Sequence, residues 1–250
     1  MKKVRLKKKY RIVLESTFML ICLVVFIYAI IHIINWKKDV DNNHKVKDEI
    51  EEHIIIDEKN DVFDIDFKAL KEINSDAIAY IKVNGTNIDY VVVKGKDNSY
   101  YLTHNFNREY NIAGWIFADY HNKLDDTDKN IVIYGHNTKD GSMFETLINV
   151  LDKNWQEDSR NQVVTLVTEN GKYKYQVFST YSIKPEDYYI NTLFYNDYDF
   201  LEFLNTIRSR SNYDYNIDLK SDDKILTLSS CIGEGQKRVV LHAKLIDITE

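Results

Sequence analysis

The chain has 250 residues and a formal net charge of −6, and 44% of its residues are hydrophobic. This apolar share is enough for a folded core, and a single proline and eight glycines exclude collagen-like and proline-rich proteins. The negative charge argues against nucleic-acid binding as the main role. The charge is uneven, because residues 1–11 contain seven lysines and arginines and no acidic residue.

An uncharged segment follows this basic tip. Residues 16–35 contain no charged side chain, and as a helix they span about 30 Å, the thickness of the hydrocarbon core of a bilayer. Tyr10 and Trp36 flank the segment, where aromatic rings favour the membrane interface. The segment is longer than the apolar part of a secretory signal, and no Ala-x-Ala cleavage pattern follows it. The sequence therefore predicts an uncleaved transmembrane signal anchor at 12–36 rather than a cleaved signal peptide.

The basic tip also predicts the orientation of this anchor. Positively charged residues beside a membrane span favour the cytoplasmic side, so we expect residues 1–11 in the cytoplasm and the remainder outside. Residues 37–61 are charge-rich and predict an extracytoplasmic stalk, partly helical around 46–56, where Glu and Lys dominate. A folded domain is expected at 62–250.

Short β-type runs dominate the chain after residue 76. Many of them alternate or are rich in β-branched residues, and Asn-Gly pairs at 84–85 and 170–171 indicate hairpins. The predicted strands are 77–83, 87–93, 114–117, 131–134, 163–167, 174–183, 225–230 and 239–248. Helices are predicted at 66–73, 143–151 and 197–210, the last with Phe200, Phe203, Leu204 and Ile207 on one face. About eight strands and few helices predict a mainly β fold, a closed or nearly closed barrel.

The chain has two cysteines, and only Cys231 lies in the part expected outside the membrane, because Cys22 is within the anchor. An unpaired extracytoplasmic cysteine indicates a reactive or intermolecular thiol, and a buried cysteine acting as a small hydrophobic residue fits the count equally well. Cys231 ends a strand-like run and precedes a short polar loop, which suits a partly exposed nucleophile. A free thiol has a pKa of about 8.5, so a nucleophilic Cys231 needs a base or cation nearby.

His136 and Arg238 are the candidate partners of this thiol. His136 directly follows the run 131–134 in Tyr-Gly-His-Asn, where a rigid strand end projects its imidazole. Arg238 lies seven residues after Cys231, and a tight hairpin across 232–237 brings its guanidinium near the thiol. Such a cation stabilises a thiolate or an oxyanion. The ordinary alternative is a solvated arginine at the start of a strand.

Metal and cofactor motifs are absent from the sequence. It contains no Cys-x-x-Cys, no zinc-spaced histidine pair, no Gly-x-Ser-x-Gly and no phosphate-binding loop. The acidic stretch 124–130 lacks the glycine and the terminal glutamate of an EF-hand loop. His242 lies inside the last predicted strand, where a structural role is expected. We therefore expect no metal ion and no cofactor.

Several segments resemble class B sortases. Thr-Leu-Ser-Ser-Cys at 227–231 is similar to the sortase signature Thr-Leu-x-Thr-Cys, and Arg238 resembles the arginine on the following sortase strand. His136 in Tyr-Gly-His-Asn resembles the sortase histidine. The resemblance covers about residue 66 to the C-terminus and includes 95–106, 113–122, 130–147 and 187–211. It implies a closed eight-stranded sortase-type β-barrel with N-terminal helices and a helical insert, 197–210, between strands 6 and 7.

The resemblance also implies a mechanism. Cys231 attacks the carbonyl of a threonine in the C-terminal sorting signal of a secreted protein, Arg238 stabilises the oxyanion, and His136 protonates the departing amine. An amine of a peptidoglycan precursor (lipid II) then opens the thioacyl-enzyme, so that the secreted protein becomes attached to the cell wall of a Gram-positive bacterium. The positions similar to the substrate groove of the family are Leu102, Tyr188, Tyr189, Ile190 and Ser229. The implied location is the cell membrane, with the catalytic domain outside.

Three positions depart from the family pattern. Ser230 replaces the usual threonine before the cysteine. Ile232 and Gly233 stand where an acidic residue is usual, and the loop from Cys231 to the arginine is short. Pro185 stands where the family often has a hydroxylated residue, so the sorting motif is left open between Asn-Pro-x-Thr-Asn-like and Pro-x-Thr-Gly-like sequences.

Three other functions stay open at this point. A class A or pilus-type sortase lacks the insert predicted at 197–210. An L,D-transpeptidase expects an arginine two residues after its cysteine, where this chain has Gly233. A non-catalytic, membrane-tethered peptide-binding module on the same barrel would leave Cys231 inert towards alkylating agents.

Overall fold

The computed structural model describes residues 8–125, 127–232 and 236–249, and the side chains of residues 8, 9, 231 and 232 lie outside this description. The chain divides into two compact units, Met1–Asn42 and Asn43–Glu250.

A single helix, α1 (Lys8–Glu51), makes up the described part of the first unit and continues into the second. The sequence has no glycine or proline within α1, so nothing interrupts its backbone hydrogen bonds. Its most apolar stretch has a mean hydropathy of 2.8 and is not buried against the protein. A helix of this length and composition is a candidate membrane anchor.

A hairpin follows α1 where the sequence predicted helix. The helix ends at Glu51, and β1 (Ile54–Asp57) pairs in antiparallel fashion with β2 (Val62–Ile65). The expected helix over 46–56 is therefore wrong beyond Glu51, because Ile54 and Ile56 are β-branched residues that pack against the hydrophobic core from a strand.

Helix α2 (Phe67–Ile73) lies where the sequence predicted it. Its first turn is capped by Asp66, whose side chain accepts a hydrogen bond from the Ala69 amide at 2.9 Å. Phe67 and Leu70 are the buried residues of this helix and pack into the barrel core. The helix is thereby fixed to the barrel.

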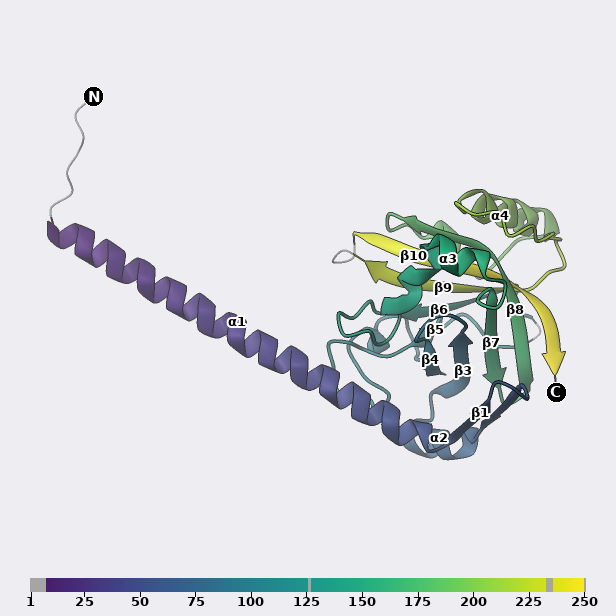
Figure 1. The fold of residues 1–250 in the computed structure, drawn as a ribbon, viewed down its shortest axis with the longest axis horizontal. Helices are drawn as coiled ribbons and strands as arrows, with labels where there is room; N and C mark the ends of the chain where they lie inside the picture. Colours follow the sequence, from purple (N-terminus) through teal and green to yellow (C-terminus); the bar gives the residue numbers. More distant parts are fainter. Residues whose placement is uncertain (1–7, 126, 233–235, 250) are drawn as a thin grey trace, which may run out of the picture. The chain divides into compact units, whose positions relative to one another are not determined.

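Eight strands form a closed barrel (Figure 1). Around the barrel the order is β10-β8-β7-β3-β4-β5-β6-β9, with β9 pairing back to β10. The pairs β4–β5 and β6–β9 are parallel and the others are antiparallel. The strands are β3 (Ala77–Val83), β4 (Asp89–Val93), β5 (Phe117–Ala118), β6 (Asn130–Gly135), β7 (Val163–Thr168), β8 (Gly171–Ile183), β9 (Ile225–Ile232) and β10 (Lys237–Thr249). The predicted closed eight-stranded barrel is confirmed.

The third barrel strand is shorter than predicted. The sequence predicted a strand over 114–117, whereas β5 contains only two residues. Gly114 adopts φ +60, and a Cβ at this position would lie 2.4 Å from the Tyr101 carbonyl oxygen. The chain therefore turns at Gly114 against η1 (Tyr100–Leu102) before it enters the sheet.

The helix predicted at 143–151 also differs. It begins two residues later as the 3₁₀ helix η2 (Glu145–Leu151), and α3 (Lys153–Glu157) follows it. Met143 has φ +53, which excludes it from a right-handed helix, and Asp152 is extended between the two segments. Backbone geometry at these two residues explains both boundaries.

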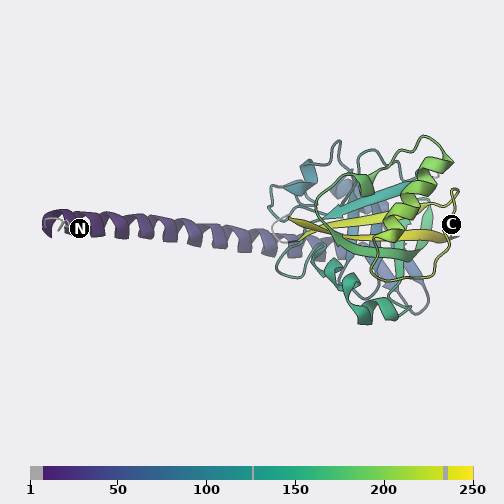
Figure 2. The same cartoon turned by 90° about the horizontal axis from the view of Figure 1, so that it is seen from above.

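The insert between the sixth and seventh barrel strands contains η3 (Tyr188–Ile190) and α4 (Asp197–Ser209). The predicted apolar face of α4, Phe200, Phe203, Leu204 and Ile207, is buried. It packs with Phe178, Ile225 and Val240 in a cluster on the outside of the barrel. Figures 1 and 2 both show α4 outside the barrel wall.

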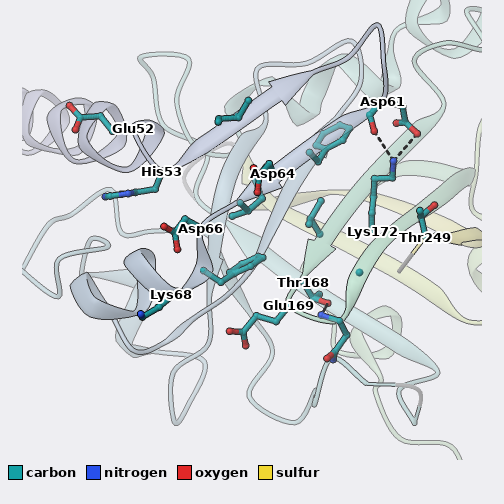
Figure 3. A pocket seen from close by; sticks show the side chains of 17 residues that line it. Glu52, His53, Asp61, Asp64, Asp66, Lys68, Thr168, Glu169, Lys172 and Thr249 are labelled. Atoms are coloured by element: carbon teal, nitrogen blue, oxygen red, sulfur yellow. Dashed lines mark hydrogen bonds and ion pairs between the residues drawn. The ribbon is translucent and has the colours of Figure 1, made fainter.

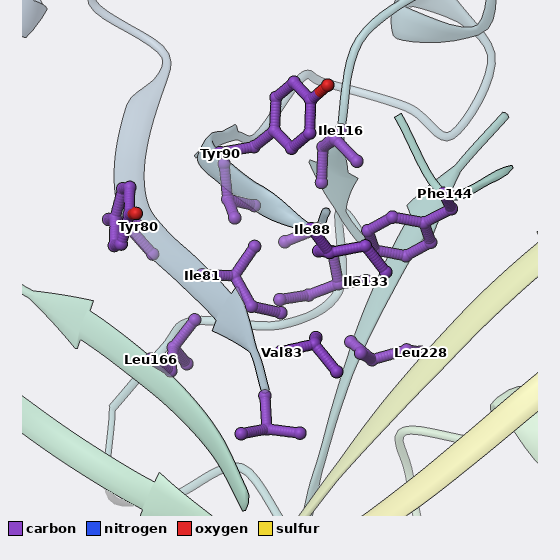
Figure 4. Packing of buried hydrophobic residues seen from close by; sticks show 14 of the residues in the cluster. Tyr80, Ile81, Val83, Ile88, Tyr90, Ile116, Ile133, Phe144, Leu166 and Leu228 are labelled. Carbon is purple, nitrogen blue, oxygen red and sulfur yellow. The ribbon is translucent and has the colours of Figure 1, made fainter. Parts of the chain in front are cut away.

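The barrel interior holds the main hydrophobic core. Figure 4 shows side chains from neighbouring strands meeting there, among them Ile81, Val83, Ile133, Leu166 and Leu228, all almost completely buried. Phe144, from the segment before η2, fills one end of this core and lies against Gly135. The strands are thus held rigidly at the end where β6 and β9 lead into the candidate site.

Candidate active site

Strand register brings the three predicted catalytic residues to one end of the barrel. In the parallel pair β6–β9, Gly135 lies opposite Ser230, and His136 is the next residue after β6 ends. In the antiparallel pair β9–β10, Arg238 lies opposite Cys231. The three backbone positions therefore occupy the ends of three adjacent strands.

A groove of about 380 Å³ opens at this end. It is lined by residues from the ends of β6, β9 and β10, from the loop containing η1, and from the loop that connects β8 to η3. His136 and Arg238 both line it; the other lining residues are Asn98, Leu102, Phe117, Tyr134, Gly135, Pro185, Glu186, Asp187, Tyr189, Ile190 and Ser229. The side chain of Cys231 lies outside the described residues.

His136 is half-buried and held by the backbone of η1. Its Nε2 lies 2.8 Å from the carbonyl oxygen of Leu102, so Nε2 carries the proton and donates it to that carbonyl. Burial lowers the pKa of His136 below its ordinary value; the bond to Leu102 opposes this shift, and the charge of Arg238 adds to it. His136 is therefore mainly neutral at pH 7, with Nδ1 as the nitrogen that is able to accept a proton.

Arg238 supplies a positive charge to the groove. Its side chain is half-buried, and Nη1 donates a hydrogen bond to the Lys237 carbonyl oxygen at 3.2 Å. Its effect on the pKa of His136 shows that the guanidinium lies within electrostatic reach of the imidazole. The groove thus combines an imidazole and a guanidinium beside the strand end that carries the cysteine.

Four of the five residues predicted to bind substrate line this groove, namely Leu102, Tyr189, Ile190 and Ser229. The Tyr189 hydroxyl and the Ser229 hydroxyl lie 2.9 Å apart, which joins η3 to β9 across the groove floor. Tyr188 does not line the groove. Its ring packs on Phe203 at 5.6 Å between centroids, because neighbouring residues of the short helix η3 project in different directions.

Other groove residues were not predicted. The Tyr134 hydroxyl donates a hydrogen bond to Asp119 at 2.8 Å, and the Asn98 amide donates to the same carboxylate at 2.7 Å. Burial, followed by the charge of Asp119, raises the pKa of Tyr134. Glu186 and Asp187 complete the wall contributed by the loop between β8 and η3. Tyr134 had a sequence signal because it adjoins the Gly-His pair, and Pro185 because it departs from the family pattern, whereas Asn98, Glu186 and Asp187 come from loops distant in sequence.

A larger cavity, of about 1170 Å³, lies elsewhere, between the β1–β2 hairpin, α2 and the β7–β8 turn. Figure 3 shows its polar residues, including Asp61, which accepts a hydrogen bond from Lys172 at 2.7 Å. Asp61 also accepts a hydrogen bond from Lys174, at 2.6 Å. None of the predicted site residues lines it. Within the described part of the chain, no group of three or more His, Cys, Asp or Glu side chains is arranged to hold a metal ion.

Comparison with known proteins agrees with this arrangement. The Sortase domain family model matches residues 81–246. Sortase B of Staphylococcus aureus is 32% identical over 250 residues, covering 98% of this chain and 100% of that protein. Sortase B of Listeria monocytogenes is 36% identical over 186 residues, covering 72% and 74% of the two chains.

Solved structures give the same result. Clostridium perfringens sortase B is 43% identical with a TM-score of 0.68, covering 72% of this chain and 100% of that chain. Sortase B of B. anthracis, solved in complex with AAEK1, is 34% identical with a TM-score of 0.74, covering 84% and 99% of the two chains. The barrel, the groove and these matches together place the chain in the sortase family of cysteine transpeptidases, in its class B branch.

Proposed function

We propose that this chain is held in the cell membrane by α1 and joins secreted proteins covalently to the peptidoglycan of the cell wall. It cleaves their C-terminal sorting signals after threonine, with Cys231 as nucleophile, His136 as acid and base, and Arg238 as oxyanion stabiliser. The observation that carries this proposal is the register that sets Arg238 opposite Cys231 and ends β6 at His136, beside one groove.

The first half of the reaction forms a thioester. The Cys231 thiol transfers its proton to His136, and the resulting thiolate attacks the threonine carbonyl carbon. The carbonyl oxygen becomes an oxyanion, which the guanidinium of Arg238 stabilises. As the C–N bond breaks, the proton on His136 passes to the departing amine, which leaves a neutral imidazole and a thioacyl-enzyme.

The second half transfers the acyl group to an amine. The acceptor nitrogen attacks the thioester carbon, His136 takes its proton, and Cys231 leaves as the thiolate and recovers a proton. A sortase B that is 32% identical to this chain has been solved in complex with triglycine, whose amino end is an acceptor of this chemical class. We propose a peptidoglycan precursor, lipid II, as the acceptor here.

The low basicity of His136 affects this cycle. Because burial and the charge of Arg238 both lower the pKa of His136, the resting enzyme contains less imidazolium than an ordinary histidine would give. The same groups that lower the pKa of His136 make its imidazolium a stronger acid towards the leaving amine. The lowered pKa thus makes His136 a weaker base towards the thiol and its imidazolium a stronger acid towards the departing amine.

The test uses the full chain in detergent micelles and quenched peptides of the Asn-Pro-x-Thr-Asn and Pro-x-Thr-Gly types. We expect cleavage after threonine, a thioacyl adduct on Cys231 by intact mass, and transfer to triglycine when it is added. Cys231→Ala loses all three. Cleavage that persists in Cys231→Ala contradicts the proposal. A wild-type chain that forms no adduct, and whose Cys231 resists alkylation, contradicts it as well.

The orientation of the anchor has its own test. We propose that the basic N-terminal tip lies in the cytoplasm and the barrel outside, because positive charge favours the inner side of a membrane. Protease added to intact protoplasts should then degrade the barrel and spare an N-terminal tag. Protection of the barrel would contradict this orientation without affecting the proposed chemistry.

A further inference from the structure

The loop between β8 and η3 gives the groove two acidic residues. Glu186 and Asp187 line the groove together with His136 and Arg238. The sequence pattern assigned neither of them a role. Their difference lies in what each carboxylate contacts.

Glu186 is neutralised within the protein. Its carboxylate forms an ion pair with Arg210, the residue that follows α4. The Arg210 guanidinium also lies 5.3 Å from the ring centre of Tyr188. The two neighbours of Asp187 in the chain, Glu186 and Tyr188, are therefore held by the same cation, which fixes the backbone on both sides of Asp187.

Asp187 itself is exposed towards the groove. It precedes η3, but its side chain does not cap that helix. Within the residues that the structure describes, no hydrogen bond or ion pair holds its carboxylate, and its charge acts on the Tyr134 hydroxyl of the same groove. Asp187 thus places a negative charge at the groove, and no side chain among the described residues forms an ion pair with it.

We propose that Asp187 is a substrate-binding residue that recognises an ammonium group in the groove. This inference rests on the proposed function. Arg238 also lines the groove and adds positive charge there, so a cationic substrate group needs a carboxylate to offset the repulsion. The ammonium comes either from a lysine of the sorting signal or from the acceptor amine before it loses its proton. A charge-assisted hydrogen bond to a held carboxylate selects such a group over a neutral one of similar size.

The role of Asp187 is tested by measuring peptide binding to a chain that lacks the Cys231 thiol, so that the result does not depend on catalysis. The full-length Cys231→Ala chain in detergent is titrated with labelled Asn-Pro-x-Thr-Asn peptides that carry a single lysine at each position in turn, each paired with the Nε-acetyl-lysine peptide. Triglycine and N-acetyl-triglycine form the acceptor pair. At one lysine position or in the acceptor pair, we expect the charged member to bind about three- to tenfold more tightly at low salt.

Matched variants assign this preference to one carboxylate. Asp187→Asn should reduce the ratio to below about twofold, and Asp187→Glu should restore most of it. Asp222→Asn removes the same charge from an exposed position that does not line the groove, and should leave the ratio unchanged. The wild-type ratio should also fall as salt is raised, since a partly exposed ion pair is screened.

Each outcome decides the inference. A charge preference in the lysine series identifies the sorting signal as the source of the ammonium, and a preference in the acceptor pair identifies the acceptor. Ratios below about twofold in every pair, or ratios that survive in Asp187→Asn, overturn it. Because binding is measured with Cys231→Ala, failure of the proposed transpeptidation in the wild-type chain is a separate result.

Discussion

The two faces of β6, β9 and β10 differ in chemistry. The face towards the barrel interior is hydrocarbon, with Ile133, Leu228 and Leu241 in one core. The outer face carries polar groups that contact one another under the insert. The Thr227 hydroxyl donates to the Asn130 side chain at 2.7 Å and lies 2.9 Å from His242 Nδ1.

The outer face continues into the insert. The Asn130 amide donates to the Asn191 carbonyl at 2.9 Å, and Tyr181 lies 2.8 Å from His242 Nε2. Asn191 follows η3, and two residues of η3, Tyr189 and Ile190, line the groove. The same strands therefore perform two tasks: their inner face forms the barrel core, and their outer face positions the loop beside the groove. Substitutions at the groove end should therefore lower activity with little loss of stability, whereas substitutions on the inner face and at the buried polar contacts of the outer face should lower stability.

The largest expected effect is on activity, at the groove end of these strands. Arg238→Gln removes the proposed oxyanion stabiliser and should lower kcat/KM for a sorting peptide about 10²- to 10³-fold. The melting temperature should change little, because Arg238 is half-buried and lies at the start of β10. Arg208→Gln, on α4 and outside the groove, is the control and should retain activity. A loss in both variants, or a large loss of stability in Arg238→Gln, would break the separation of the two tasks.

Much of the fold was predictable from the sequence, because local pattern and packing agree there. The apolar face of α4 and most barrel strands follow from side-chain periodicity alone. The hairpin at β1 was missed because the β-branched run at Ile54 follows a charged stretch that favours helix, and only its tertiary partners decide between the two.

The sequence predicts the catalytic residues of the candidate site, but not all of the residues that line the groove. The chemistry of Cys231, His136 and Arg238 and a family resemblance both indicate these three residues, and strand register brings their backbones together. Asp187 gave no signal, because its exposure to the groove depends on Arg210, which lies after a helix and contacts the loop only in the folded chain. Such loop positions are fixed by tertiary contacts that no local pattern encodes.

The second effect concerns stability on the inner face. Leu228 is completely buried in the barrel core, so Leu228→Ala should lower the free energy of unfolding by about 2–5 kcal/mol. Ile246→Ala, on an exposed position of β10, is the control and should cost less than about 0.5 kcal/mol. Urea unfolding of the full chain in detergent, followed by tryptophan fluorescence, measures both. Equal effects of the two substitutions would contradict a core inside the barrel.

The third effect concerns the polar contacts of the outer face. Thr227→Val keeps the shape of the side chain but removes the hydroxyl that joins Asn130 to His242, and should cost about 1–3 kcal/mol of unfolding free energy. Thr165→Val on β7 is the matched control, since this buried threonine has no side-chain hydrogen bond within the described residues and should tolerate the change. If Thr227→Val leaves the unfolding free energy unchanged, the polar contacts of the outer face do not contribute to stability.

The smallest effect is a pH dependence that belongs to His242. Thr227 donates its proton to Asn130, so it accepts from His242 Nδ1, and Nε2 accepts from the Tyr181 hydroxyl; this arrangement requires a neutral imidazole. Burial lowers the pKa of His242 to about 3, with a smaller contribution from the charge of Arg210. The unfolded chain has an ordinary histidine pKa of about 6.5, so at pH values between about 3 and 6.5 it binds a proton at His242 that the folded chain does not bind.

The sign of this effect follows from the depressed pKa. The stability that depends on neutral His242 is fully present above about pH 6.5 and is lost as the pH falls towards 3. When the pH is lowered from about 7 to about 5.5, the protonation of His242 in the unfolded chain should lower the unfolding free energy of the wild-type protein by about 1 kcal/mol. His242→Gln should remove that part of the slope, whereas His104→Gln, at a half-buried loop position outside the barrel strands, should keep it. If both variants keep the wild-type slope, the acid sensitivity arises elsewhere, and the outer face does not depend on a neutral histidine.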